Sequence, residues 1–143
     1  MKIKIVNNQK MLNQALKVRE NVFINEQKVP LSEENDQYET KATHFLVYNK
    51  KNQPIATCRT RVYADNKVKI ERVCVLKAYR GLKIGENLIN FAEQAAKNQG
   101  FKEAILGAQT TVLDFYQKLG YQVCSKPFME ANMEHYLMKK SLF

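Results

Sequence analysis

The stretch from Arg80 to Gly85 constrains the fold of this 143-residue chain more than any other. It reads Arg-Gly-Leu-Lys-Ile-Gly and lies between an apolar run, residues 73–76, and an amphipathic segment over residues 86–98. This pattern predicts a strand that passes through a short basic turn into a helix. Backbone N–H groups converge at such a helix start, and the helix dipole favours an anion there. We therefore predict a phosphate-binding turn. The alternative is an ordinary strand–turn–helix connection with a surface arginine.

Two common phosphate motifs do not fit these residues. A P-loop needs a Lys-Ser or Lys-Thr pair after its last glycine, whereas Glu86 and Asn87 follow Gly85. A dinucleotide fingerprint needs strands that alternate with helices. The chain before the turn instead predicts consecutive strands, over Thr43–Asn49, Pro54–Tyr63 and Lys67–Leu76. Both nucleotide-binding folds are excluded.

The remaining periodicities predict an α+β fold. Turns are expected at residues 50–53 and 64–66, and the helix after Gly85 should end at Gly100. Asn7 or Asn8 is the expected cap of the first helix. The other expected elements are a strand over Lys2–Val6, a helix over Gln9–Phe23, an irregular segment over Pro30–Glu39, a strand over Glu103–Leu106, a helix over Thr111–Leu119, and strands over Tyr121–Cys124 and Glu134–Lys140. Their order predicts one domain, residues 1–143, with a mixed central sheet flanked by helices.

Composition narrows the function. No apolar run approaches the roughly 18 residues that a membrane helix needs, so we expect no membrane partner. Cys58, Cys74 and Cys124 form no Cys-x-x-Cys pair, which favours reduced thiols in the cytoplasm and no metal site. The net charge of +9 comes from scattered lysines without a basic stripe, so we expect no nucleic-acid partner. We expect a monomer or a homodimer.

The turn and its surroundings resemble the GNAT superfamily of acyl-CoA-dependent N-acetyltransferases. Arg80 and Gly85 match the ends of the family's pyrophosphate loop, whereas Lys83 replaces its middle glycine. Residues 116–121, Tyr-Gln-Lys-Leu-Gly-Tyr, look like the end of the family's C-terminal helix, and Gln109 stands where asparagine is usual. Further matches resemble the small bacterial branch that includes ElaA and YjcF: Arg19, Val22-Phe23, Glu26-Gln27, Val29-Pro30, Glu34, Asp36, Thr43-His44-Phe45, Phe128, Glu130-Ala131 and His135.

The resemblance implies acetyl-CoA as the cofactor, with CoA as its product. It implies a GNAT fold in which the strand before the turn splays from the next strand and admits the pantetheine; the alternative is a continuous buried strand. Backbone groups freed by the splay would pair with the cofactor as an added strand does. The implied cofactor-binding residues are Val73, Cys74, Val75, Arg80, Gly81, Leu82, Lys83, Ile84, Gly85, Gln109 and Tyr116.

Acetyl transfer to an amine needs a proton donor for the departing thiolate and a base for the amine. The resemblance places Tyr116 beside the thioester sulfur, so we predict it as the general acid; the alternative is a core position. Strand alternation places Glu71 on the same face as Val73 and Val75, where partial burial would raise its pKa and suit it to act as base. The alternative is a salt bridge from Glu71 to Arg59 or Arg61. His44 and His135 are further candidates as base or substrate ligand.

Arg59 and Arg61 lie two residues apart and point to one face of their strand. One interpretation is a clamp for a carboxylate of the acceptor, and the other is pairing with Glu71 or with the acidic segment. That segment would attract a cationic amine and consists of Glu33, Glu34, Asp36 and Glu39.

Together these residues predict an N-acetyltransferase that acts on a primary amine of a small molecule, with an amino acid as the expected acceptor. The alternative is a non-catalytic module of the same fold that binds acyl-CoA as a sensor.

Overall fold

The computed structural model describes residues 1–30, 34, 36, 38–39 and 41–143. Its helices are α1 (Gln9–Arg19), α3 (Ile84–Asn98) and α4 (Leu113–Lys118), with a π-helix over Glu20–Glu26 and 3-10 turns over Lys77–Tyr79 and Thr110–Val112. Its strands are β1 (Lys2–Ile5), β2 (Thr43–Tyr48), β3 (Pro54–Ala64), β4 (Lys67–Val75), β5 (Glu103–Gln109), β6 (Gln122–Val123), β7 (Phe128–Glu130) and β8 (Met133–Ser141). Every predicted strand is present, and β7 is an addition that the sequence patterns did not reveal.

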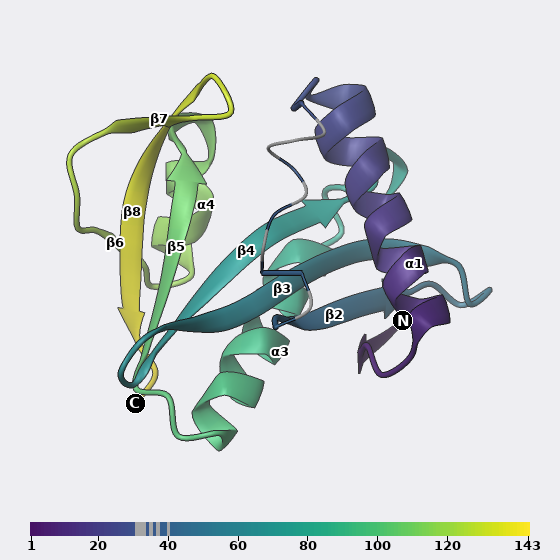
Figure 1. Cartoon of the computed structure of the whole chain (residues 1–143), viewed down its shortest axis with the longest axis horizontal. Helices are drawn as coiled ribbons and strands as arrows, with labels where there is room; N and C mark the ends of the chain where they lie inside the picture. The colour runs from purple at the N-terminus through teal and green to yellow at the C-terminus, as the bar shows by residue number, and fades with distance from the viewer. Residues whose placement is uncertain (31–33, 35, 37, 40) are drawn as a thin grey trace.

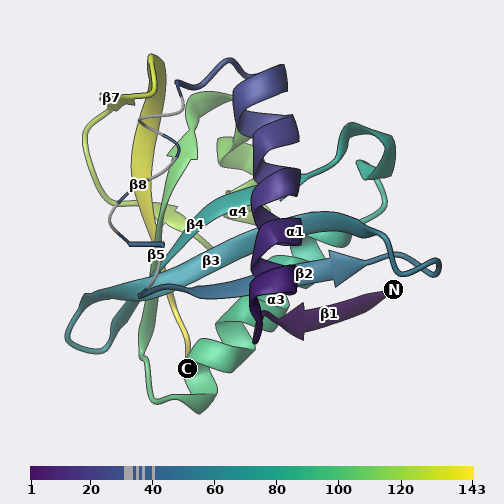
Figure 2. The same cartoon turned by 45° about the vertical axis from the view of Figure 1, so that its right-hand side comes forward.

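The strands form one mixed sheet in the order β1-β2-β3-β4-β5-β8-β6, with β7 paired to β8 (Figure 1). β4 and β5 are parallel, and the other pairs are antiparallel. β1 lies at one edge beside β2 (Figure 2). The predicted α+β class with a mixed central sheet is confirmed.

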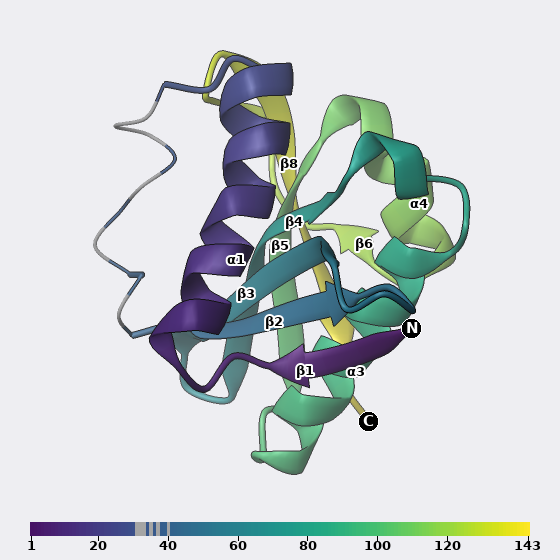
Figure 3. The same cartoon turned by 90° about the vertical axis from the view of Figure 1, so that its right-hand side faces the viewer.

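Helices cover both faces of the sheet. α1 lies on one side, whereas α3 and α4 lie on the other (Figure 3). Val18 of α1 packs with Cys74 of β4, and Leu88 of α3 packs with Phe45 and Ile55. The side chain of Asn8 accepts a 2.8 Å hydrogen bond from the backbone N–H of Met11 and caps α1, as predicted.

The first helix differs from its prediction in its last part. α-Helical geometry ends at Arg19, and the chain continues to Glu26 as a π-helix. Val22 stays buried on the α1 face, but the wider turns carry Gln27 to the mouth of the gap between β4 and β5. π-Helical turns are rare and concentrate at functional sites.

The tight turns sit where expected. Asn52 and Asn66 adopt positive φ angles of 59° and 62° in the two predicted hairpin turns. Asparagine tolerates this left-handed conformation better than most residues. In the unpredicted β7–β8 hairpin, Ala131 and Asn132 have φ angles of 51° and 61°.

A β-bulge at Arg72 changes which residues of β4 point toward α1 and which point toward α3. Thr57 opposes Cys74, and Arg59 opposes Glu71, so β4 has one extra residue between these pairs. Arg72 adopts φ +56° there. Ile70 and Val73 both pack toward α3, so Glu71 points to the α1 face. The predicted shared face of Glu71, Val73 and Val75 is therefore wrong, because the bulge resets the alternation.

The predicted splay between β4 and β5 is present. The two strands pair only over residues 67–69 of β4 and 103–105 of β5. Beyond Lys69 and Ile105 they diverge, as Figure 1 shows. Val73, Cys74 and Val75 lie in the part of β4 that has no β5 partner. The continuous buried strand is excluded.

The three cysteines are free thiols. Cys58 packs under α3 and Cys74 under α1, whereas Cys124 is exposed. Among the described residues, we find no helix with the length and apolarity that crossing a membrane requires.

Candidate active site

The splay opens into a cleft of about 990 Å³. It runs from the turn before α3, between β4 and β5, to the β7–β8 hairpin. All predicted cofactor residues except Leu82 line it, and so do Glu34, Glu71 and His135. Phe23 and Val29, which belong to the family matches, also line it, and lining residues that the sequence did not single out include Lys69, Gly107, Val112 and Phe115.

The turn before α3 has the backbone that anion binding requires. Gly81 has φ +82°, and Lys83 stands at the N-cap of α3 with φ +62°. The first N–H groups of this 15-residue helix have no partner within the helix, so they are available to a phosphate. Lys83 occupies the position where the family has glycine. A left-handed lysine costs roughly 1 kcal/mol more than glycine, and it adds a positive charge at the helix start.

Gly85 lies in the first turn of α3, next to α4 and β4. A Cβ atom on Gly85 would lie 3.4 Å from the ring of Phe115 and 3.8 Å from Cγ2 of Val75. Both are ordinary van der Waals distances, so a small side chain fits there, whereas a longer side chain would push against the Phe115 ring.

Arg80 is tied to both sides of the cleft. Its guanidinium makes a two-pronged ion pair with Glu26 at 2.7 and 2.8 Å, and its Nε donates to the carbonyl of Val75 at 2.9 Å. The hydrogen bonds and charge of Arg80 lower the pKa of Glu26. The family match at Glu26-Gln27 singled out Glu26 in the sequence. It did not reveal that Arg80 is the partner of Glu26.

Tyr116 lies on the α3–α4 side of the cleft. It is 8% exposed and packs edge-to-face on Phe115 and Tyr121, with centroids 5.0 and 5.9 Å apart. Burial raises the pKa of the Tyr116 phenol, which therefore stays protonated at neutral pH. Tyr116 is thus both a packed residue and a wall of the cleft, so the two interpretations of this residue are compatible.

Gln109 and His135 lie opposite each other on β5 and β8 and face the cleft. Gln109 donates a 3.2 Å hydrogen bond to Gln27 at the end of the π-helix. Nδ1 of His135 lies 2.8 Å from the carbonyl oxygen of Met133, and its ring stacks on Phe128.

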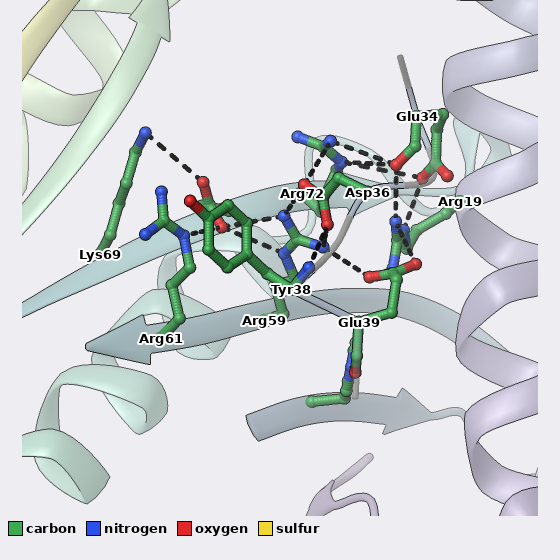
Figure 4. Close-up of polar contacts among 11 residues, drawn as sticks. Arg19, Glu34, Asp36, Tyr38, Glu39, Arg59, Arg61, Lys69 and Arg72 are labelled. Atoms are coloured by element: carbon green, nitrogen blue, oxygen red, sulfur yellow. Dashed lines mark hydrogen bonds and ion pairs between the residues drawn. The ribbon is translucent and has the colours of Figure 1, made fainter. Parts of the chain in front are cut away.

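A network of arginines and carboxylates covers the α1 face beside the cleft (Figure 4). Arg19 is 1% exposed and donates to the Glu34 carboxylate at 2.6 Å and to Glu39 at 3.0 Å. Arg59 is fully buried and donates to Asp36, Glu39 and Glu71. The network connects α1, β3 and β4 to the described residues between 34 and 39.

The predicted carboxylate clamp at Arg59 and Arg61 is not supported by these contacts. Three protein carboxylates occupy Arg59. Arg61 donates to Glu71 at 2.9 Å and stacks on the Tyr38 ring at 3.9 Å. Neither arginine is among the described residues that line the cleft. The alternative interpretation, pairing with Glu71 and the acidic segment, is the one observed.

The expected rise in the pKa of Glu71 is also wrong. Burial acts to raise it, but the hydrogen bond from Arg61 and the charges of Arg59 and Lys69 outweigh burial and lower the pKa. Glu71 lines the cleft as a carboxylate held by three cations. It is consequently a weaker base than the sequence led us to expect.

The described carboxylates of the acidic segment pair with arginines of the network. Glu34 is buried against Arg19, and Asp36 binds Arg59 and Arg72. Glu33 lies outside the described residues. Attraction of a cationic amine by this segment is therefore not supported, because arginines neutralise its described carboxylates.

His44 lies away from the cleft. It is buried on β2, and its Nε2 is 3.0 Å from the carbonyl oxygen of Glu39. Burial lowers its pKa, which disfavours the charged ring. His44 is not among the described cleft residues, so the site contains only one of the two predicted histidines.

The network predicts a loss of stability in acid. Burial acts to raise the pKa of Asp36, but hydrogen bonds from Arg59 and from the Tyr38 backbone leave it at about 2, below its ordinary 3.8. The pKa values of Glu39 and Glu71 are lowered too. Depressed carboxyl pKa values contribute stability above the unfolded-state values, near 4, that is lost as pH falls toward 2.

We therefore expect the free energy of unfolding in urea to fall as pH decreases from about 5 to about 2, most steeply below about pH 4. Asp36→Asn should flatten this dependence, since the amide does not titrate. An equally steep dependence in this variant would remove Asp36 from the explanation.

Comparison with known proteins agrees with this geometry. The acetyltransferase (GNAT) domain family matches residues 7–142. The N-acetyltransferase YjcF of Bacillus subtilis is 40% identical over 141 residues, which cover 98% of this chain and 99% of YjcF. A crystal structure of a Lactobacillus plantarum protein assigned to the N-acetyltransferases has a TM-score of 0.94 at 30% identity, covering 99% of this chain and 98% of that one.

Escherichia coli ElaA shares the fold, with a TM-score of 0.87 at 24% identity over 98% of this chain and 99% of ElaA. The splayed strands and the glycine turn thus occur in a sequence that the family profile covers almost completely. This chain belongs to the GNAT family of acetyltransferases and resembles its small bacterial members YjcF and ElaA.

Proposed function

We propose that this protein is an N-acetyltransferase that moves an acetyl group from acetyl-CoA to a primary amine of a small molecule in the cytoplasm. The observation that carries the proposal is the splay of β4 from β5, which joins the basic turn before α3 to the buried phenol of Tyr116 in one cleft. A pyrophosphate fits the turn because the first N–H groups of α3 and the positive charge of Lys83 converge there.

Acetyl-CoA supplies the acetyl group as a thioester. Tyr116 acts on the sulfur side of the reaction. Because burial raises its pKa, the phenol is a weaker acid than a thiol, whose pKa is about 8.5. It therefore donates a hydrogen bond to the sulfur as the C–S bond breaks, and its proton moves only as negative charge develops there.

The acceptor end of the cleft admits a small amine. Its walls come from β4, β5 and the β7–β8 hairpin. Because carboxylates neutralise Arg59 and Arg61, nothing in the described cleft favours an amino acid over another small amine. The alternative function is a sensor that binds acyl-CoA without turnover, and no feature of the described cleft favours it.

The cofactor end predicts an effect of charge at Gly85. We expect Gly85→Asp to weaken acetyl-CoA binding at least about fivefold relative to Gly85→Asn, because repulsion between charges 4 Å apart amounts to about 1–4 kcal/mol in partly solvated surroundings. Both side chains displace Phe115 equally, so the difference reports charge alone. Isothermal titration with acetyl-CoA measures it, and equal affinities would place the phosphates elsewhere.

The proposed activity is tested by adding acetyl-CoA to the protein with amino acids, polyamines and peptides as separate acceptors, and following thiol release. Thermal stabilisation by acetyl-CoA together with amine-dependent thiol release supports the enzyme. Stabilisation without release from any acceptor supports the sensor. Absence of stabilisation at saturating acetyl-CoA would overturn both.

A further inference from the structure

We propose that His135 is the general base that takes the proton from the acceptor amine, a role that rests on the proposed acetyltransferase function. The position, the tautomer and the side of the cleft on which His135 lies each support this role.

His135 is held rigidly at the acceptor end of the cleft. It is 7% exposed, lines the cleft and lies opposite Gln109 in the β5–β8 pair. Phe128 of β7 stacks on its ring with centroids 5.7 Å apart and planes at 22°. A base must be positioned before it can act, and packing on two strands limits how far this ring can turn.

The backbone selects the tautomer that a base needs. Nδ1 of His135 lies 2.8 Å from the carbonyl oxygen of Met133. A carbonyl oxygen only accepts hydrogen bonds, so Nδ1 carries the hydrogen. In the neutral ring, Nε2 is then left with its lone pair and can accept a proton. The same hydrogen bond would stabilise the imidazolium that forms.

His135 and Tyr116 lie on opposite sides of the splay. Opposed residues in an antiparallel pair point to the same side, so His135 shares the side of Gln109, which contacts Gln27 on the α1 side. Tyr116 clusters on the other side, with alternate β5 residues such as Ala108. An amine that enters from the α1 side thus meets the base, while the thiolate leaves toward the acid.

The proton balance is complete with these two residues. The amine nitrogen forms a bond to the carbonyl carbon, Nε2 of His135 takes the N–H proton, and the C–S bond breaks with the electron pair on sulfur. The hydroxyl of Tyr116 gives its proton to the thiolate, which leaves as the thiol. The Tyr116 phenolate then takes a proton from solvent, and the His135 imidazolium releases one to solvent.

Other candidate bases are less suited. The pKa of Glu71 is lowered by its arginine partners, and His44 lies away from the cleft. Glu134, next to His135 on β8, accepts a hydrogen bond from Thr110. Among the described lining residues, the other charged groups at this end of the cleft are Glu34, Lys69, Arg72 and Glu130.

The first test determines the tautomer of His135 directly and needs no acceptor. The chain has two histidines, so their signals can be assigned with one variant. Long-range ¹H–¹⁵N spectra of the ¹⁵N-labelled protein distinguish the two ring nitrogens, and His44→Gln assigns the signals. We expect His135 as the Nδ1–H tautomer at pH 8. An Nε2–H tautomer at pH 8 would overturn the proposal.

The second test compares His135→Asn with the parent protein across pH 5.5 to 9, using the amine panel described above. Asparagine keeps a donor for the Met133 carbonyl but has no basic nitrogen. We expect kcat/KM to fall at least about a hundredfold, and the acidic limb of the profile to disappear. With hydroxylamine as the acceptor, which is mostly uncharged at neutral pH, the same variant should lose much less of its kcat/KM. His44→Gln, away from the cleft, should keep the parent profile.

The outcomes separate this proposal from the function on which it rests. A parent that acetylates no amine overturns both. An active parent whose acidic limb persists in His135→Asn overturns the base alone. A matched melting temperature for His135→Asn excludes unfolding as the cause of any loss.

Discussion

Replacement of Tyr116 by phenylalanine is expected to lower kcat about tenfold to thousandfold while the affinity for acetyl-CoA stays nearly unchanged. Phenylalanine keeps both edge-to-face contacts, with Phe115 and Tyr121, and removes only the hydroxyl. A group that acts on the departing sulfur contributes to the transition state, so its loss should appear in kcat. Steady-state thiol release and calorimetric titration with acetyl-CoA measure the two quantities.

Tyr121→Phe is the matched control. Tyr121 packs against Tyr116, but its hydroxyl donates to buried Glu93 at 2.6 Å, away from the cleft. We expect this variant to lose stability and to keep kcat. An unchanged kcat in Tyr116→Phe, with chemistry as the limiting step, would restrict Tyr116 to a packing role.

Arg59→Ala is expected to destabilise the protein by about 3–5 kcal/mol, the usual cost of removing one partner from a buried ion pair. Its guanidinium is fully buried among Asp36, Glu39 and Glu71, and their charges would remain without it. A domain whose total stability is about 5–15 kcal/mol would be close to unfolding. Urea unfolding followed by circular dichroism measures the loss.

Arg61→Ala is the control for Arg59→Ala. Arg61 is partly exposed and shares Glu71 with other cations, so its loss should cost about 1 kcal/mol. If both variants lost similar free energies of unfolding, the burial of Arg59 would not make its ion pairs more stabilising than those of Arg61. If Arg59→Ala kept full stability and changed the preference among acceptors, the carboxylate clamp would regain support.

The network also explains why Arg72 tolerates a strained backbone. Its guanidinium donates to the carbonyl oxygen of Glu34 and to Asp36, and it stands at the bulge that turns Glu71 toward the α1 face. Bulges often occur next to active sites, where they redirect side chains.

Local patterns in the sequence predicted most of the helices and strands and the glycine-containing turn before α3. Apolar-rich runs bounded by turn residues identified β2, β3 and β4, and asparagine marked the hairpin turns because it tolerates positive φ better than most residues. The position of Gly85 before an amphipathic helix was sufficient to predict an anion site. Each of these features depends on residues that are neighbours in the chain.

Only the tertiary structure decided the chemistry at the acceptor end. The bulge at Arg72 and the pairing of Arg59 with three carboxylates depend on contacts between segments that are not neighbours in the chain. The sequence allowed Arg59 to bind either a substrate or the protein, and it allowed either face for Glu71. Burial and the charges packed around each group settled these alternatives, because the free energy of a buried charge depends on every partner that surrounds it.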